Sequence, residues 1–78
     1  MNLEIITPEQ KLYAGIVKEV QVPGVDGLLG ILDNHAPLIS TLKEGVVKVK
    51  DAKGVENRFD IAGGVVEVLN NKVIILAE

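Results

Sequence analysis

The only imidazole in this 78-residue chain belongs to His35, which stands close in sequence to the carboxylates of Asp26 and Asp33. An imidazole oriented by a carboxylate is a common general base, so these residues have the types needed to abstract a proton. His35, however, follows the turn-forming Asn34 and precedes Ala36-Pro37. A histidine in such a place more often hydrogen-bonds to loop backbone, and we expect no catalytic residue.

Metal and phosphate chemistry lack the side chains that they need. One histidine and no cysteine cannot make the usual zinc site, and the 11 carboxylates are scattered rather than spaced as in a calcium-binding loop. No glycine-rich motif of the Walker or dinucleotide-binding type is present. We therefore expect no cofactor and no metal.

A different class of function is left open by Lys53, which lies in the turn-forming run Asp51-Ala52-Lys53-Gly54. Lipoyl and biotinyl carrier domains are small all-β domains that present one modified lysine at a hairpin tip. The residues that flank Lys53 do not match the Asp-Lys or Met-Lys-Met motifs of those domains. A solvated turn lysine is the simpler interpretation, but a carrier domain and a generic protein-interaction module remain alternatives.

The composition describes one small domain, residues 1–78. Hydrophobic residues make up 47% and aromatics only 3%, so Val, Ile and Leu must fill the core. The net charge of −3 argues against a nucleic-acid partner. The absence of cysteine points to a reducing compartment. No apolar run is long enough to span a membrane, and the first residues do not read as a signal peptide.

The elements that must position any site are short strands. Runs rich in Val, Ile and Thr, cut by Gly and Pro, predict about eight to ten strands and no helix. Such an order predicts an all-β fold, a small antiparallel β-sandwich or flattened barrel. The expected strands are residues 3–7, 11–13, 16–22, 28–32, 38–42, 46–50, 55–61, 66–68 and 73–77.

Several details of these strands can be predicted. Alternation places Val47, Val49, Val66 and Val68 inward and Lys48, Lys50 and Glu67 outward. Gly15 marks a bend or bulge, after which Ile16, Val20 and Val22 share one face of the strand and Glu19 and Gln21 lie on the other. Asn70-Asn71 supplies a two-residue hairpin turn, which requires positive φ angles. The strand at 72–77 is apolar on both faces and is expected to be central in its sheet or covered by a partner.

The segment Gly27 to Leu38 carries the strongest functional signal. A half-buried strand alternates apolar and polar residues, but Leu28, Leu29, Ile31 and Leu32 put apolar groups on both faces. In a protein with one core, at least one of these faces must be covered by another protein or left exposed. The pattern indicates a docking edge rather than a catalytic pocket.

The run from Gly24 to Leu38, with Gly-Ile-Leu followed by His-Ala-Pro-Leu, closely resembles the signature loop of the epsilon subunit of F-type ATP synthase. The resemblance continues in residues 42–47, 63–68 and 71–77, and so covers nearly the whole chain. Two departures stand out. The family commonly has Pro-Gly where Asp33-Asn34 stands, which is tolerated because Asn accepts a left-handed conformation, and it often has an acidic residue in place of Leu28.

The resemblance implies a β-sandwich that is a non-catalytic rotor component of an ion-translocating ATP synthase. It would pack against the gamma subunit and rest on the c-ring, peripheral to the membrane on the bacterial cytoplasmic face or its matrix or stromal equivalent. The family usually continues into a regulatory helical hairpin, which we expect to be absent from a chain that reaches only Glu78. The contact residues that it implies are Asp26, Leu28, Leu29, Ile31, His35 and Pro37, of which Asp26, Leu28 and His35 are expected to contribute to the contact with the c-ring. How Leu29, Ile31, Leu38 and Leu42 divide between core and interface stays open.

Overall fold

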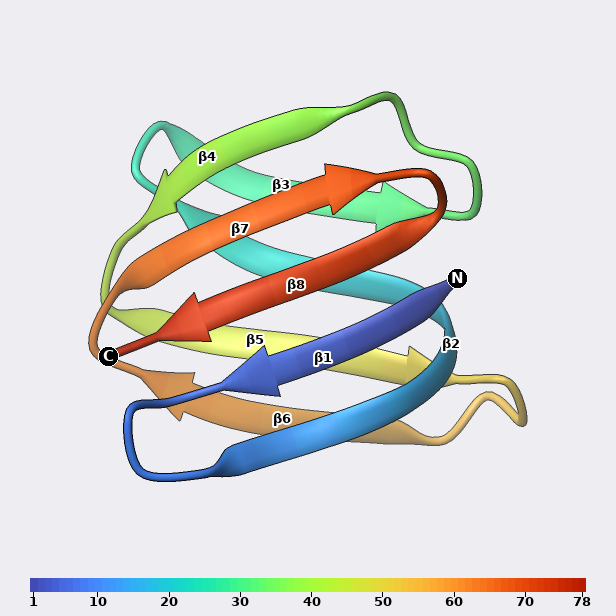
Figure 1. Ribbon diagram of the computed structural model, residues 1–78, viewed down its shortest axis with the longest axis horizontal. Coiled ribbons are helices and arrows are strands. Elements are labelled where there is room, and N and C mark those ends of the chain that lie inside the picture. The colour runs from blue at the N-terminus through green and yellow to red at the C-terminus, as the bar shows by residue number, and fades with distance from the viewer.

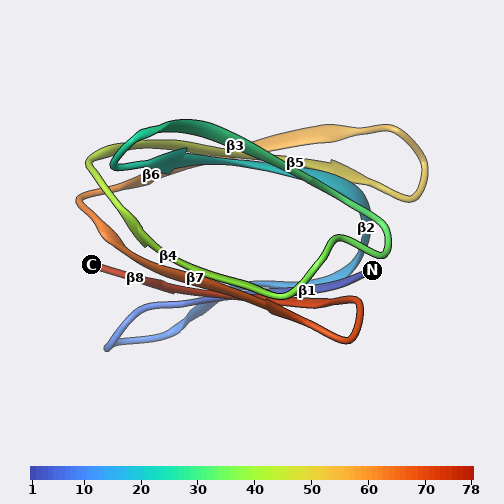
Figure 2. The ribbon, with the colours of Figure 1, turned by 90° about the horizontal axis from the view of Figure 1, so that it is seen from above.

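The computed structural model describes residues 1–78 as a two-layered β-sandwich without helices, so no element could span a bilayer as a long apolar helix (Figures 1 and 2). The all-β fold predicted from the strand pattern is confirmed. The strands are β1 (Asn2–Ile6), β2 (Lys11–Gly24), β3 (Gly27–Leu32), β4 (Leu38–Leu42), β5 (Gly45–Asp51), β6 (Glu56–Ile61), β7 (Gly64–Leu69) and β8 (Lys72–Ala77).

The long strand β2 connects the two layers. Its first half pairs with β1, which continues through β8 and β7 to β4, and these strands make up the first layer. Its second half pairs with β3 on one side and β5 on the other, and β6 completes this second layer. Figure 2 shows the layers face to face, with β2 curving from one to the other.

One prediction for β2 is wrong. The strand runs unbroken through Gly15, and its pairing with β5 shifts register between Val17 and Glu19 instead. An extra residue at a bulge reverses which later positions face inward. Val17 and Val20 are therefore both buried although three positions apart. Ile16, predicted to share the face of Val20 and Val22, is 65% exposed, whereas those two valines are buried.

The core is entirely apolar and no polar or charged residue is buried. The alternation predicted for β5 and β7 is confirmed, because Val47, Val49, Val66 and Val68 are buried. Branched side chains from both layers fill the interior, as the shortage of aromatics requires. The buried set is Met1, Leu3, Ile5, Val17, Val20, Val22, Ile31, Leu42, Val47, Val49, Ile61, Val66, Val68, Val73, Ile75 and Ala77.

The predicted central position of the last strand is also confirmed. β8 lies between β7, its antiparallel neighbour, and β1, which runs parallel to it. A purely antiparallel sandwich was expected, so this parallel pair is a difference. The parallel pair could not be predicted, because turn signals indicate pairing only between strands that are adjacent in sequence. β1 and β8 come from opposite ends of the 78 residues.

Candidate docking surface

The side chains of β3 divide between the two sides of its layer. Antiparallel pairing places Leu28 opposite Pro23, Leu29 opposite Val22 and Ile31 opposite Val20. Leu28 and Leu32 are 67% and 58% exposed, whereas Leu29 packs half-buried against the core. The strand is apolar on both sides, as its sequence indicates.

The inclusion of Ile31 among the predicted contact residues needs correction. Its side chain is completely buried, so it presents no surface to a partner. The sequence could not decide whether Ile31 is buried or exposed, because β3 carries apolar residues on both of its faces. Leu29 also faces inward and offers only the part of its side chain that the core leaves uncovered.

The remaining predicted contact residues do not form one patch. Asp26 lies in the turn that precedes β3, whereas His35 and Pro37 follow it, so β3 separates them (Figure 1). Six residues of extended strand span about 17 Å at roughly 3.4 Å per residue. Asp26 and Leu28 therefore belong to one end of the sandwich, and His35 and Pro37 belong to the other.

The turn after β3 is held at several points. Asp33 Oδ1 lies 2.5 Å from the α-amino nitrogen of Met1, which also donates to the carbonyl of Val17. Asn34 adopts φ 61°, the left-handed conformation predicted for it, and its N–H donates to Asn71 Oδ1 at 2.8 Å. These bonds fix the loop against β2 and the β7–β8 hairpin.

His35 is held by backbone and not by a carboxylate. Its ring Nδ1 lies 2.7 Å from the carbonyl oxygen of Ala36, and because a carbonyl only accepts, Nδ1 is the donor. Asp33 is engaged by the α-amino group of Met1 instead. Asp26 lies beyond the other end of β3. No dyad of histidine and carboxylate is assembled.

A second group of exposed apolar side chains lies on the outside of the first layer, around Glu67, and it was not predicted from the sequence. Ile39, Val65, Leu69 and Leu76 are 73%, 38%, 50% and 54% exposed there, and we call them the outer apolar face. Next to them a hollow of about 440 Å³ is lined by Pro37, Leu38, Ile39, Glu67, Val68 and Leu69. The sequence feature that could have predicted this face is the two-sided apolar pattern of β8, because the outward residues of β8 belong to it.

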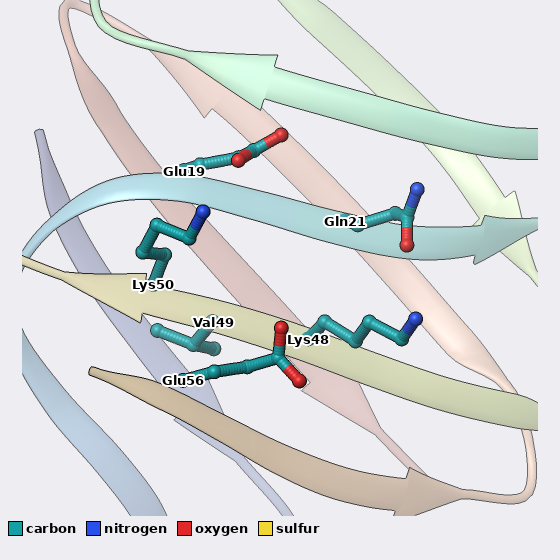
Figure 3. A pocket seen from close by; sticks show the side chains of 6 residues that line it. All are labelled: Glu19, Gln21, Lys48, Val49, Lys50 and Glu56. Atoms are coloured by element: carbon teal, nitrogen blue, oxygen red, sulfur yellow. The ribbon is translucent and has the colours of Figure 1, made fainter. Parts of the chain in front are cut away.

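The opposite outer surface, over β2, β5 and β6, is polar. Figure 3 shows a shallow hollow there, lined by Glu19, Gln21, Lys48, Val49, Lys50 and Glu56. Its volume of about 150 Å³ is below the roughly 300–1,000 Å³ of small-molecule sites. Charges of both signs alternate across the strands, as on an ordinary solvated sheet face, and the Arg58 side chain hydrogen-bonds to Glu56 at 3.0 Å.

The structure also shows the surroundings of the possible metal ligands and of Lys53. No group of three or more His, Asp or Glu side chains is arranged to hold a metal ion. Lys53 lies in the β5–β6 turn, where its N–H and that of Val55 donate to Asp51 Oδ1 at 2.8 and 2.9 Å. Asp51 thus shapes an ordinary turn around Lys53.

Comparison with known proteins gives a consistent result. Residues 1–78 match the family model described as ATP synthase, Delta/Epsilon chain, beta-sandwich domain. Relatives named ATP synthase epsilon chain include one from Syntrophomonas wolfei, 43% identical over 97% of this chain and 56% of the relative. Others come from Leptospira borgpetersenii, 42% identical over 100% and 61%, and Chlorobaculum tepidum, 42% identical over 99% and 88%. The chain thus spans less than two thirds of two of these relatives.

Solved structures share the fold. A chain in the cryo-EM structure of Euglena gracilis mitochondrial ATP synthase (OSCP/F1/c-ring) superposes with a TM-score of 0.91 over 96% of this chain and 48% of that chain. A chain of the Tetrahymena thermophila mitochondrial ATP synthase (central stalk/c-ring) gives 0.82 over 99% and 62%. Both are 21% identical in sequence, so the likeness is one of fold.

Proposed function

Because the chain belongs to the family of ATP synthase delta/epsilon chains, as their β-sandwich domain, we propose that it is a non-catalytic part of the rotor. In this role residues 1–78 act as one domain that joins the gamma subunit to the c-ring. The domain then transmits ion-driven rotation to the catalytic head and lies at the membrane surface, on the bacterial cytoplasmic face or its organellar equivalent. It breaks no bond itself.

The main observation in support of this proposal is that the domain has a complete apolar core and, in addition, two separate exposed apolar surfaces. The core holds 16 apolar residues and no polar one, so the exposed leucines and isoleucines are surplus to folding. Contiguous apolar surface on a small protein marks an interaction site. A rotor subunit that joins gamma to the c-ring must bind two neighbours at the same time, and two separate apolar surfaces allow it to do so.

The contact residues divide accordingly. Asp26 and Leu28, at one end of β3, form one contact, and His35 and Pro37, at the other end, form a second. Pro37 also lines the hollow beside the outer apolar face, so the second contact is continuous with that face. We assign this more extensive second contact to gamma and the first to the c-ring. His35 then leaves the c-ring contact that the resemblance implies for it, because it lies at the opposite end of β3 from Asp26 and Leu28.

The test is co-expression of the domain with the gamma subunit of the same organism, followed by size-exclusion chromatography at micromolar concentration. We expect one co-eluting complex, which Ile39→Lys weakens at least tenfold and Lys53→Ala leaves unchanged. Ile39 lies on the outer apolar face and Lys53 in a remote turn. Two separately eluting proteins would contradict the proposal, as would an acyl or biotinyl mass added at Lys53.

A further inference from the structure

The free edge of β3 presents unpaired backbone groups. β3 pairs only with β2, so one of its edges has no strand beside it. The carbonyl of Pro23 accepts from Lys43, and the N–H of Val25 donates to Thr41, which are both on the β4 side of β2. Backbone groups of successive strand residues point to opposite edges, so Val22 and Gly24 bond toward β3. Their partners are Leu29 and Gly27, and the groups of Leu28, Gly30 and Leu32 therefore point away from β2.

This edge carries none of the usual protection. Edge strands are commonly guarded by charged side chains, proline or a bulge, because open backbone groups recruit further strands. The other edge of the same layer, β6, carries Glu56, Arg58 and Asp60, all exposed. β3 carries no charge between Gly27 and Leu32 and shows no register shift against β2.

The side chains beside the free backbone groups are arranged symmetrically. Leu28 and Leu32 stand two positions on either side of Gly30 and are 67% and 58% exposed. A side chain at Gly30 would meet nothing within 4 Å, so the surface between the leucines is open. When two copies of such a strand run antiparallel with Gly30 facing Gly30, each Leu28 faces the Leu32 of the other copy.

We propose that the occupant of this edge is a second copy of the chain, joined through antiparallel pairing of β3 with β3 about a two-fold axis at Gly30. The central Gly30 pair then exchanges both backbone hydrogen bonds. Each flanking pair gains the bond from the Leu32 N–H to the Leu28 carbonyl, because the Leu32 carbonyl already accepts from the N–H of His35 at 3.2 Å. A two-fold contact needs a self-complementary surface, and this strand has one. Because glycine has no side chain, the two Gly30 residues at the axis leave room for the Leu28–Leu32 pairs on either side to contact each other.

The dimer uses a surface that docking also needs, and this consequence rests on the proposed function. Leu28 belongs to the contact assigned to one end of β3, so a copy that is paired through β3 cannot make that contact. The self-paired form is then an unassembled state of the domain, in which its unprotected edge is covered. The interface is small, so association is weak and concentration-dependent.

The test is sedimentation equilibrium of the 78-residue domain at concentrations up to about 1 mM, a range that reveals weak dimers. We expect a monomer–dimer equilibrium, and amide hydrogen exchange at Leu28, Gly30 and Leu32 that slows as concentration rises. Gly30→Pro removes the outward N–H without touching a bond to β2, and a proline is tolerated at such a position. It is expected to weaken the dimer at least tenfold with an unchanged melting temperature.

Paired lysine variants keep the test decisive even if the proline variant fails to fold. Leu28→Lys and Leu32→Lys are expected to abolish the dimer, whereas Leu76→Lys, on the outer apolar face, retains it. A domain that stays monomeric at every concentration overturns the proposal. So does a dimer that Leu76→Lys abolishes, or one in which the exposed edge of β6 becomes protected. None of these outcomes involves gamma, so the proposed function is judged separately.

Discussion

The backbone N–H of Asn34 donates a 2.8 Å hydrogen bond to the side-chain oxygen Oδ1 of Asn71, and so joins the turn after β3 to the β7–β8 turn. Both residues have positive φ, 61° and 59°. Asn71→Gly keeps the backbone conformation and removes only the acceptor. We expect it to lower the free energy of unfolding by about 1 kcal/mol, the usual contribution of one hydrogen bond.

Urea denaturation measures this loss, and Asn70→Gly is the matched control. Asn70 shares the turn and has φ 50°, but it accepts no bond from Asn34. Equal stabilities of the two glycine variants would show that the link between the turns contributes nothing.

Leu28 and Leu29 are expected to respond oppositely to a charge. Leu28→Asp places a carboxylate on a side chain that is 67% exposed, so the melting temperature should move by no more than a few degrees. Leu29→Asp places it on a half-buried side chain that packs against the core, where the domain loses part of the roughly 1.5–3 kcal/mol that full burial of a leucine contributes and must also desolvate a charge. A small domain has little more than this in reserve, so cooperative melting should disappear. Circular dichroism melts decide the matter, and similar curves would reverse the assignment of faces.

Asn34 provides a test of backbone strain. Its φ of 61° suits glycine and penalises β-branched residues. Asn34→Gly is expected to be neutral or slightly stabilising, and Asn34→Val to cost on the order of 1 kcal/mol or more. The bond to Asn71 uses only the backbone N–H of Asn34, so it is available in both variants. Urea denaturation compares the two, and an Asn34→Val variant as stable as the Asn34→Gly variant would argue against strain.

Gly64, at the start of β7, has no room for a side chain. A Cβ there would stand 2.1 Å from the carbonyl oxygen of Leu76, and its φ is 141°. Gly64→Ala should therefore destabilise the domain by about 3 kcal/mol or more, among the large effects of single substitutions. Gly30→Ala is the control, because its Cβ would meet nothing within 4 Å. Thermal melts in which the two variants match would contradict the close approach of β7 and β8.

Acid stability should depend in part on Glu4. The hydrogen bond from Lys11 Nζ, at 2.9 Å, lowers the pKa of its carboxyl below the ordinary 4.5, and the charge of Lys72 adds to this effect. A folded-state pKa below the unfolded one gives stability that is present above pH 4.5 and lost as the pH falls through the folded value. Melting temperatures from about pH 6 to about pH 2.5 should therefore fall less steeply for Glu4→Gln than for the natural chain. Because the pair is exposed, about 0.5 M salt should shrink this difference; a difference that salt leaves intact would point to another cause.

The local features of this fold were predictable from sequence where one interaction dominates. The Asn70-Asn71 turn, the left-handed Asn34 and the alternation of β5 each depend on neighbours in the chain, and each was predicted. Ile16 was misplaced because the bulge between Val17 and Glu19 has no glycine or proline to announce it. A bulge is decided by how β2 must bend to serve both layers, which is a property of the whole fold.

The candidate site was predictable only in part for a related reason. The two-sided apolar pattern of β3 identified an exposed strand, but it could not say that Ile31 fills the core while Leu32, next to it, lies outside. That division depends on which face of β3 meets the other layer. The outer apolar face was missed because Ile39, Val65 and Leu76 come from three strands and become neighbours only in the folded sheet.

The parallel pairing of β1 with β8 bears on how the chain reaches its folded state. Residue 2 pairs with residue 72 and residue 6 with residue 76, so this ladder closes a loop of nearly the whole domain. Contacts between such distant residues slow folding, because chain entropy must be lost before they form. On a ribosome, β1 emerges first and must wait for β8, with only β2 available as a neighbour. Until then the inward side chains Leu3 and Ile5 have an incomplete cover, and the nascent domain is at its most vulnerable to aggregation and proteolysis.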